Sequence, residues 1–410
     1  MDTSLFIAGR IARNRQRSFS RLIIRLSVAA TTLSVATMVL ALAFVNGFQQ
    51  VISEKIFSFW GHLRIQRLEA YKVNVAEETP MERNDTVLRR IAAMPQVSDV
   101  QAFATRSAIL NANGSIEGVL FKGVEPGYRF ASLTPFLKKG RWLLPDDSTR
   151  NREIVISEAM AAQLDMDVGQ DLLLYFIRPG EDRPRTRKLR VCGLFRTGID
   201  IYDKTFAYGD LALAQRLNGW NSAQIGGYEV VLSDPRQMDL LSDLIYEGLP
   251  QGWDSKTLLQ IHPEIFDWLN LQDTNKYILL TVMTLVAAIN LITCLIILVL
   301  ERTRMVGVLK ALGMIDWAVQ KIFLAHGALI MLRGIGWGMA LGLGICLLQV
   351  QTGFIRLDEE AYYMDRAPVA VVWWQVGAVA AGTFLACLAV LLLPSLVSRR
   401  IQPARAVQFR

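Results

Sequence analysis

Few residues of this sequence have the types and spacing needed for catalysis or for binding a metal. Its three histidines, His62, His262 and His326, are scattered, and none lies in an H-E-x-x-H pattern. The four cysteines show no paired spacing that would indicate a disulfide framework or a metal site. The chain contains no G-x-x-x-x-G-K-S/T loop for nucleotide phosphates and no G-x-S-x-G elbow around a serine. We therefore expect a protein that is not an enzyme by itself and that binds no metal or cofactor.

One charged segment has the pattern of a helix that presents a surface. Residues 301–314, ERTRMVGVLKALGM, separate two apolar runs that are each long enough to cross a bilayer. Apolar residues at i, i+3, i+4 and i+7 form one stripe on this helix: Met305, Val308, Leu309 and Leu312. The other candidate contact residues of the segment are Glu301, Arg304, Lys310 and Gly313. Two interpretations fit: a helix lying on anionic lipid, or a coupling helix that binds a cytoplasmic motor protein.

The ends of this helix can also be predicted. Gly313 is suited to the left-handed conformation that terminates many helices. A second helix is expected to begin near Asp316, whose carboxylate can cap the free N–H groups of the first turn.

The elements that must position this segment are membrane spans. The chain has 410 residues, of which 52% are hydrophobic and 20% charged, and the apolar residues fall in blocks. Four blocks reach the roughly 20 residues that cross about 30 Å of hydrocarbon: 22–45, 278–300, 322–348 and 369–393. The first is too long for the apolar region of a signal peptide. The net charge of +7 is modest, and no basic stripe with interleaved aromatic residues suggests nucleic-acid binding.

The distribution of Lys and Arg gives an orientation. These residues are frequent before the first span, in residues 301–321 and in the tail, whereas residues 351–367 contain two Arg beside four Asp or Glu. Because basic loops stay in the cytoplasm, both termini and the 301–314 helix are expected there. Residues between the first two spans then lie outside.

The fold class expected is an α-helical membrane bundle of four transmembrane helices with a large mixed α/β extracytoplasmic domain between helices 1 and 2. Three parts are expected: 1–48, a cytoplasmic amphipathic N-terminus and the first span; 49–275, the α/β domain; and 276–410, the other spans with the tail. Within the domain, alternation predicts strands at 97–104, 118–124, 171–176 and 228–232, and helical periodicity predicts helices at 157–164 and 235–247. Residues 261–276 could form a helical stalk.

Two features inside the third span concern packing and polarity. Gly334, Gly338 and Gly342 recur every four residues, the small-residue pattern that lets helices approach closely. Arg333 lies near the middle of the span as drawn above, where a charge costs about 2.5–3.5 kcal/mol on insertion scales. We expect Arg333 to face the bundle interior and to donate to Asn290 of the second span or to a backbone carbonyl. The alternative is that the span starts later and Arg333 lies at a wetted edge.

Several segments together resemble one family. ERTRMVGVLKALGMIDWAVQKIFL resembles the cytoplasmic loop of FtsX-like ABC transporter permeases. VNGFQQVISEKIFSFWGHLRI (45–65) and IRLDEEAYYMDRAPVAV (355–371) are similar to the lipoprotein-releasing (LolC/LolE) type, and IQPARAVQFR resembles the tail of these permeases. The resemblance covers nearly the whole chain. It departs at Ile315, where the family often has Ser or Thr, and at Pro179–Pro184, which is at most a short form of the family's carrier-binding hairpin.

The resemblance implies a permease in the inner membrane of a Gram-negative bacterium. Two permeases, identical or paralogous, would pair above two copies of a separate ATPase, which binds the ATP. The complex would lift a lipoprotein substrate from the membrane and release it to a periplasmic lipoprotein carrier. The outer end of the first span would line the lipid path, with Val39, Leu42, Val45, Asn46 and Phe48 as candidates. The alternatives are an FtsX-like scaffold that regulates a cell-wall hydrolase and a MacB-like efflux permease.

Overall fold

The computed structural model describes residues 19–68, 78–144, 150–176, 184–358, 362 and 364–395. These form two compact units. The first comprises the described parts of Met1–Gln50, Trp268–Arg356 and Arg366–Arg410, and the second those of Val51–Asp267 and Leu357–Asp365. These divisions lie near the residue 48 and residue 275 boundaries expected from the sequence.

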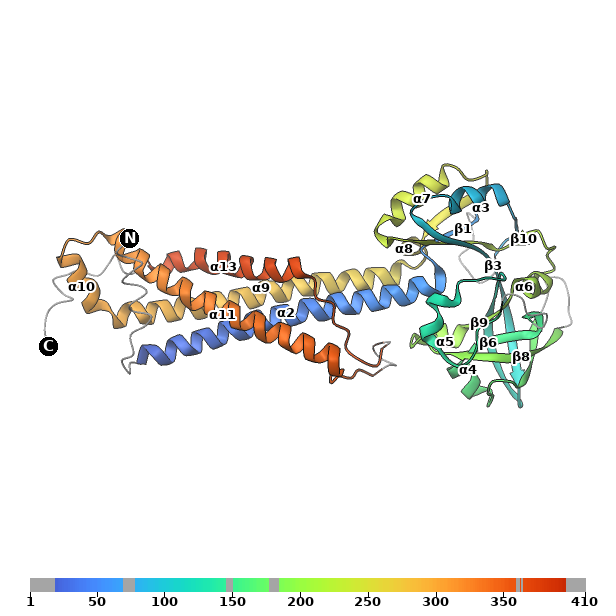
Figure 1. Cartoon of the computed structure of the whole chain (residues 1–410), viewed down its shortest axis with the longest axis horizontal. Helices are drawn as coiled ribbons and strands as arrows, with labels where there is room; N and C mark the ends of the chain where they lie inside the picture. Colours follow the sequence, from blue (N-terminus) through green and yellow to red (C-terminus); the bar gives the residue numbers. More distant parts are fainter. Residues whose placement is uncertain are drawn as a thin grey trace. The chain divides into compact units, whose positions relative to one another are not determined.

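The first unit is built from long apolar helices (Figure 1). They are α2 (Phe19–Trp60), α9 (Pro263–Glu301), α11 (Asp316–Thr352) and α13 (Trp373–Ser395), with the short α10 (Thr303–Ala311) between α9 and α11. In the described part of the chain, these four long helices have the length and apolar composition needed to cross a membrane, as expected.

The helix ends differ from the sequence-based ones. Helix α2 continues past Asn46 and Gly47, without interruption, to Trp60, so residue 48 lies inside a helix. Helix α13 starts at Trp373 rather than at residue 369. Residues 367–372 are not helical, and the N–H of Ala370 donates to the carbonyl of Ala43 in α2 at 3.0 Å.

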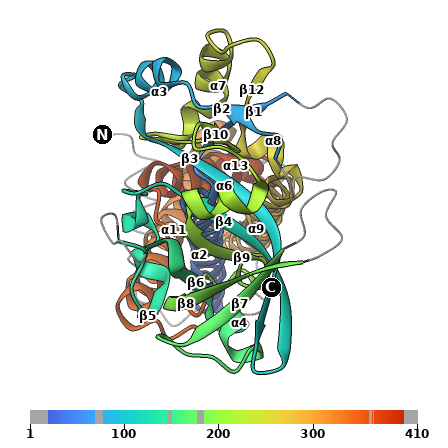
Figure 2. The same ribbon diagram turned by 90° about the vertical axis from the view of Figure 1, so that its right-hand side faces the viewer.

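The second unit is organised around a mixed sheet (Figure 2). Along the sheet, the strands are β12 (Trp253–Thr257), β1 (Leu63–Arg67), β11 (Gly227–Leu232), β3 (Val97–Ala112), β4 (Ser115–Val124), β9 (Phe206–Asp210), β6 (Glu153–Ser157), β8 (Arg185–Phe195) and β5 (Leu137–Gly140). Strand β7 (Asp171–Phe176) pairs with both β3 and β8, so β3, β4, β9, β6, β8 and β7 close into a ring. Closing a sheet removes unpaired strand edges.

Short helices complete this unit. They are α3 (Asp85–Ala92), α4 (Glu158–Gln163), α5 (Asp200–Thr205), α6 (Leu211–Asn218), α7 (Met238–Tyr246) and α8 (Leu258–Ile261). The strands and helices predicted within the domain are confirmed, although β3 extends eight residues beyond Ala104, to Ala112. The predicted stalk is the start of α9. Most of the predicted hairpin turn at 179–184 lies outside the described residues.

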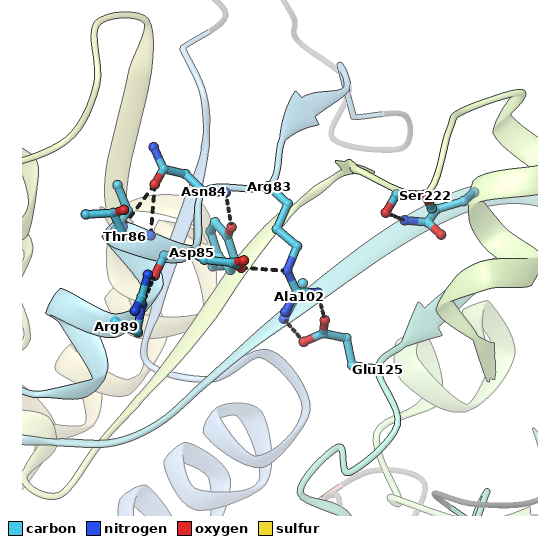
Figure 3. Close-up of polar contacts among 11 residues, drawn as sticks. Arg83, Asn84, Asp85, Thr86, Arg89, Ala102, Glu125 and Ser222 are labelled. Atoms are coloured by element: carbon cyan, nitrogen blue, oxygen red, sulfur yellow. Dashed lines mark hydrogen bonds and ion pairs between the residues drawn. The ribbon is translucent and has the colours of Figure 1, made fainter.

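A separate small sheet is fastened to the large one by the residues that follow it (Figure 3). Strand β2 (Met81–Glu82) pairs with β10 (Gln224–Ile225). Arg83 then forms ion pairs with Asp85 and with Glu125, and Glu125 in turn accepts from the N–H of Ala102 in β3 at 3.1 Å. Asn84 caps α3 through its side-chain oxygen, which accepts from the N–H groups of the first turn.

Candidate functional site

Helix α10 ends in a tight, well-defined turn. Gly313 has a φ of +89°, a conformation that costs a residue with a Cβ atom but not glycine. The N–H of Gly313 donates to the carbonyl of Lys310 and the N–H of Met314 to that of Leu309, each at 3.0 Å. This pair of bonds is the Schellman motif, which satisfies carbonyls that the helix leaves free. The loop between α9 and α11 is therefore ordered by its own backbone.

The start of α11 is stabilised differently from what the sequence suggested. The residue before its first turn is Ile315, and no side chain caps the helix there. Asp316 is instead the first residue of the helix, and its carboxylate lies 2.9 Å from the ammonium of Lys310. An acidic residue in the first turn is favourable there because of the helix dipole. Lys310 thus ties α10 to α11, and its side chain is nearly buried.

The apolar stripe predicted on α10 is divided in the structure. Met305 and Leu309 are half-buried, and the residues that anchor the helix to the bundle are Val306 and Gly307. Val308 is 49% exposed and Leu312 is 80% exposed.

Two further apolar residues extend the exposed part. Ile315 is 68% exposed and Trp317 is 48% exposed. We call Val308, Leu312, Ile315 and Trp317 the α10 surface. The apolar stripe did not predict Ile315 and Trp317, because the helical period of this segment ends at Gly313. Large apolar residues directly after the terminating glycine are the feature of the sequence that could have indicated this longer exposed surface. Glu301 and Arg304 are also exposed on this loop.

The candidate lipid-path residues on α2 separate into two groups. Val39 and Leu42 are 1% and 5% exposed and belong to the apolar core of the bundle, so they do not line an open path in this structure. Packing of α2 against the other helices covers that face, and the assignment of these two residues to a lipid path stays a prediction. Val45, Asn46 and Phe48 are half-buried.

Contacts of the half-buried group hold the neighbouring helices together. The amide of Asn46 donates to the side-chain oxygen of Gln375 in α13 at 2.5 Å. The ring of Phe48 meets that of Trp268 in α9 edge to face, with centroids 5.5 Å apart. A Cβ atom at Gly47 would lie 2.7 Å from the carbonyl of Pro368, so glycine allows this close approach.

The three glycines of α11 lie against α2. A Cβ atom at Gly338 would lie 2.7 Å from that of Val35, and one at Gly334 would lie 2.7 Å from that of Thr31. At Gly342 the nearest atom, Val39 Cβ, would be 3.1 Å away. The two helices therefore approach along a line on which any larger residue of α11 requires a shift.

The two polar residues of the spans do not meet as expected. Asn290 donates to the backbone carbonyl of Ser27 in α2 at 3.1 Å. Arg333 is exposed on the bundle, and within the described residues no bond joins it to Asn290. The expectation that it faces the interior is wrong, because Gly334 occupies the side of α11 that faces α2 and the neighbouring residue turns outward. Moreover, α11 has 37 residues, or about 55 Å, so Arg333 need not lie at mid-membrane depth.

The second unit contains buried charges beside the last turn of α2. The ammonium of Lys122 lies 2.7 Å from the carboxylate of Glu229 and donates to the carbonyl of Phe59 at 2.8 Å. The hydroxyl of Tyr128 donates to the other oxygen of Glu229 at 3.1 Å. Burial lowers the pKa of Lys122, and the Glu229 carboxylate partly opposes this. No local sequence pattern indicates this cluster, because Lys122 and Glu229 come from strands far apart in the chain.

A second ion pair is buried with the first. The guanidinium of Arg64 lies 3.4 Å from Glu78, which also accepts from the N–H of Thr105 at 2.7 Å. Arg64 stacks between two aromatic rings, 4.7 Å from the centre of Trp60 and 4.2 Å from that of Phe103. Burial is the largest influence on Glu78 and raises its pKa, against the effect of Arg64. These contacts fix the end of α2 to the sheet.

In the described ranges, no three or more His, Cys, Asp or Glu side chains gather as ligands for a metal ion. The site consists of helix contacts and exposed apolar side chains. Together with the four membrane-length helices and the inserted α/β domain, these features describe a polytopic membrane protein that exposes apolar side chains at α10.

The family follows from the sequence matches. Residues 26–246 match the MacB-like periplasmic core domain, and residues 277–403 match the FtsX-like permease C-terminal domain. The chain therefore belongs to the FtsX-like permeases that carry a MacB-like periplasmic core domain. The resemblance inferred from motifs is thereby confirmed.

Curated relatives match along their whole length. The chain is 24% identical to the lipoprotein-releasing system transmembrane protein LolE of Haemophilus influenzae, with 99% of each chain covered. It is also 24% identical to LolC of Neisseria meningitidis serogroup B, with 98% of each chain covered. The crystal structure of the periplasmic region of MacB from Actinobacillus actinomycetemcomitans covers 51% of this chain and 95% of its own, at 16% identity and a TM-score of 0.35.

Proposed function

We propose that this chain is the permease subunit of an ABC transporter that extracts lipoproteins from the inner membrane and releases them to a periplasmic carrier. ATP hydrolysis is assigned to a separate chain, and this chain itself is not an enzyme. Similarity to proteins named lipoprotein-releasing over nearly the full length of both chains supports the proposal. The main structural observation in its favour is the α10 surface. Its apolar side chains are exposed, and backbone hydrogen bonds at Gly313 and Met314 order the loop that presents them.

Placement in the membrane follows from charge. The basic residues around α10 and the acidic ones between α11 and α13 support a cytoplasmic α10 and a periplasmic α/β domain. Both termini are then cytoplasmic. An ATPase dimer in the cytoplasm would meet the α10 surface, and its closure would move α10 together with α11, to which the Lys310–Asp316 ion pair joins it.

The substrate explains why external work is needed. Removing an acyl chain from lipid costs about 0.8 kcal/mol for each CH₂ group. Within α2, Val45, Asn46 and Phe48 remain the candidates for lining the lipid path, beside a second permease that is either a copy or a paralogue of this chain. Nucleic acid has no part in this function.

Reconstitution tests the proposal directly. The chain would be purified together with its ATPase and placed in proteoliposomes that contain a triacylated lipoprotein and a soluble acceptor. ATP is expected to transfer the lipoprotein to the soluble fraction, and vanadate is expected to stop the transfer. Hydrolysis without any transfer would contradict lipoprotein release. If hydrolysis instead activated an added cell-wall hydrolase or exported a dye, the scaffold or the efflux function would replace it.

A further inference from the structure

A groove on the outside of the helix bundle combines two arginines with apolar walls. It lies between α2 and α11 and has a volume of about 630 Å³, within the usual range of roughly 300–1,000 Å³ for ligand sites. From α2 it is lined by Arg25, Val28 and Thr32, which share one helical face, and from α11 by Arg333 and Trp337. Both arginines are exposed, and Trp337 is 68% exposed.

Both arginines lie at one depth in the membrane. From Arg333 to the end of α11 at Thr352 is about 19 residues, or about 28 Å of helix. From Arg25 to the polar pair at Asn46 in α2 is about 21 residues, or about 31 Å. Since the hydrocarbon core is about 30 Å thick, a bilayer with one surface at Asn46 and Thr352 would put both arginines at headgroup level on the side that carries α10.

Neither arginine has a counterion within its reach in the described residues. No hydrogen bond or ion pair joins either side chain to another described residue. The four apolar runs 22–45, 278–300, 322–348 and 373–392 contain no Asp or Glu. A second copy of this chain packed against the groove would therefore bring no carboxylate from its spans. Two guanidinium groups at headgroup level attract negative charge, and no described residue of this chain supplies it to either side chain.

We propose that this groove binds an anionic phospholipid of the surrounding bilayer, with its phosphate between Arg25 and Arg333. The acyl chain lies along Val28, Trp337 and Leu341. Guanidinium groups bind phosphate oxygens through paired N–H donors. An anionic phospholipid has no headgroup ammonium to offset its phosphate, so two cations favour it over zwitterionic phosphatidylcholine. Basic pockets between transmembrane helices at the cytoplasmic surface are suited to such headgroups. The site depends on insertion of the four helices and not on the identity of the transported substrate.

Fluorescence of Trp337 tests the proposal. The full-length chain would be placed in phosphatidylcholine nanodiscs with small amounts of dibrominated phosphatidylglycerol or dibrominated phosphatidylcholine as quenchers. Subtracting the signal of W337F from that of the parent isolates Trp337 from the other eight tryptophans. Phosphatidylglycerol is expected to quench Trp337 at a mole fraction lower by about 30-fold, a factor of about five for each arginine.

The variants separate charge from folding. R25Q and R333Q are each expected to lower the lipid preference about fivefold, and R25Q/R333Q to abolish it. R25K/R333K should keep most of the preference, since an ammonium still attracts phosphate. R356Q, which removes an exposed arginine elsewhere on the same unit, should keep all of it. Equal quenching by both lipids, no quenching by either, or the same loss in R356Q or R25K/R333K as in R25Q/R333Q would overturn the proposal.

Discussion

At the scale of single residues, the second unit depends on four charges buried beside the last turn of α2. Two are cations, Arg64 and Lys122, and two are anions, Glu78 and Glu229, and all four side chains are at most 4% exposed. Such a group is tolerated only while the charges balance and the hydrogen bonds are complete. Its contribution is to fix the helix end rather than to add net stability.

The balance of these charges can be tested with a double-mutant cycle. K122M leaves the Glu229 carboxylate buried without its cation, and E229Q leaves the Lys122 ammonium buried without its anion. Each substitution is expected to lower the free energy of unfolding by about 3–5 kcal/mol. K122M/E229Q restores neutrality and should cost clearly less than the sum. Denaturant unfolding of the full chain in detergent measures all three. Additive losses would show that the two side chains contribute independently.

A buried histidine makes the stability of the same unit depend on pH. The N–H of Leu232 donates to Nδ1 of His62 at 3.0 Å, so this nitrogen carries no proton. Burial lowers the pKa of His62 from 6.5 to about 4. The unfolded chain therefore takes up a proton at a higher pH than the folded one. The contribution of His62 to stability is complete above pH 6.5 and is lost as the pH falls toward 4.

The size of this loss is about 3 kcal/mol, since each pKa unit corresponds to about 1.4 kcal/mol. H62Q keeps an acceptor for the Leu232 N–H but cannot be protonated. Its unfolding free energy should fall less steeply than that of the parent protein between pH 6.5 and 4. Parallel curves for the two proteins would assign the acid sensitivity to other groups.

At the scale of elements, α10 exposes apolar side chains that contribute little to packing within the bundle. Val306 and Gly307 hold the helix to the bundle, whereas Leu312 is 80% exposed. L312D should therefore leave the bundle folded while removing about 2 kcal/mol of burial against the ATPase. This corresponds to an affinity lower by about 30-fold. Co-purification and stimulated hydrolysis measure it.

The control for this substitution is L240D, because Leu240 in α7 of the other unit is 69% exposed. It should bind the ATPase as the parent does. L309D tests the inner side of the helix, and since Leu309 is half-buried it is expected to reduce stability as well as binding. Normal binding by L312D would leave lipid as the partner of the α10 surface.

The glycine line of α11 gives a second prediction at this scale. A leucine at position 338 would have to displace Val35 and the backbone of α2, so G338L is expected to separate the two helices and lower the melting temperature of the bundle. Gly344, also on α11, has nothing within 4 Å of a Cβ position, so G344L is the matched control. Equal melting temperatures for G338L, G344L and the parent would mean that the close approach does not contribute to stability.

Elements with a strong period were predictable, and contacts between them were not. Four apolar runs and Gly313 indicate the spans and the end of α10 from local sequence alone. The stripe on α10 could not show which side faces the bundle, because Met305 and Leu312 look alike in the pattern. Lys122 lies in a strand whose alternation would place a charge in solvent, yet it is buried. Its partner, Glu229, is more than 100 residues away in sequence, and only the sheet register brings them together.

At the scale of the whole molecule, the proposed transport requires that motion at α10 reach the α/β domain. Helix α2 is a candidate for this, because it is continuous from Phe19 to Trp60 and contributes residues to both units. Its last turn is fixed to the sheet by Lys122 and Arg64. A continuous helix transmits displacement along its axis only while its backbone hydrogen bonds are unbroken.

Insertion of Gly-Gly-Ser between Gln50 and Val51 is therefore expected to stop lipoprotein release while ATP hydrolysis continues. Glycines in a helix interior cost about 1 kcal/mol each relative to alanine and would interrupt α2 at this point. The control places the same insertion between Gln251 and Gly252, in an exposed turn where a Cβ at Gly252 would meet nothing within 4 Å. That variant should release lipoprotein normally. Release and hydrolysis would be measured together in proteoliposomes. If the α2 insertion released as much lipoprotein per ATP as the control, transmission would have to run through α9 or through a partner chain.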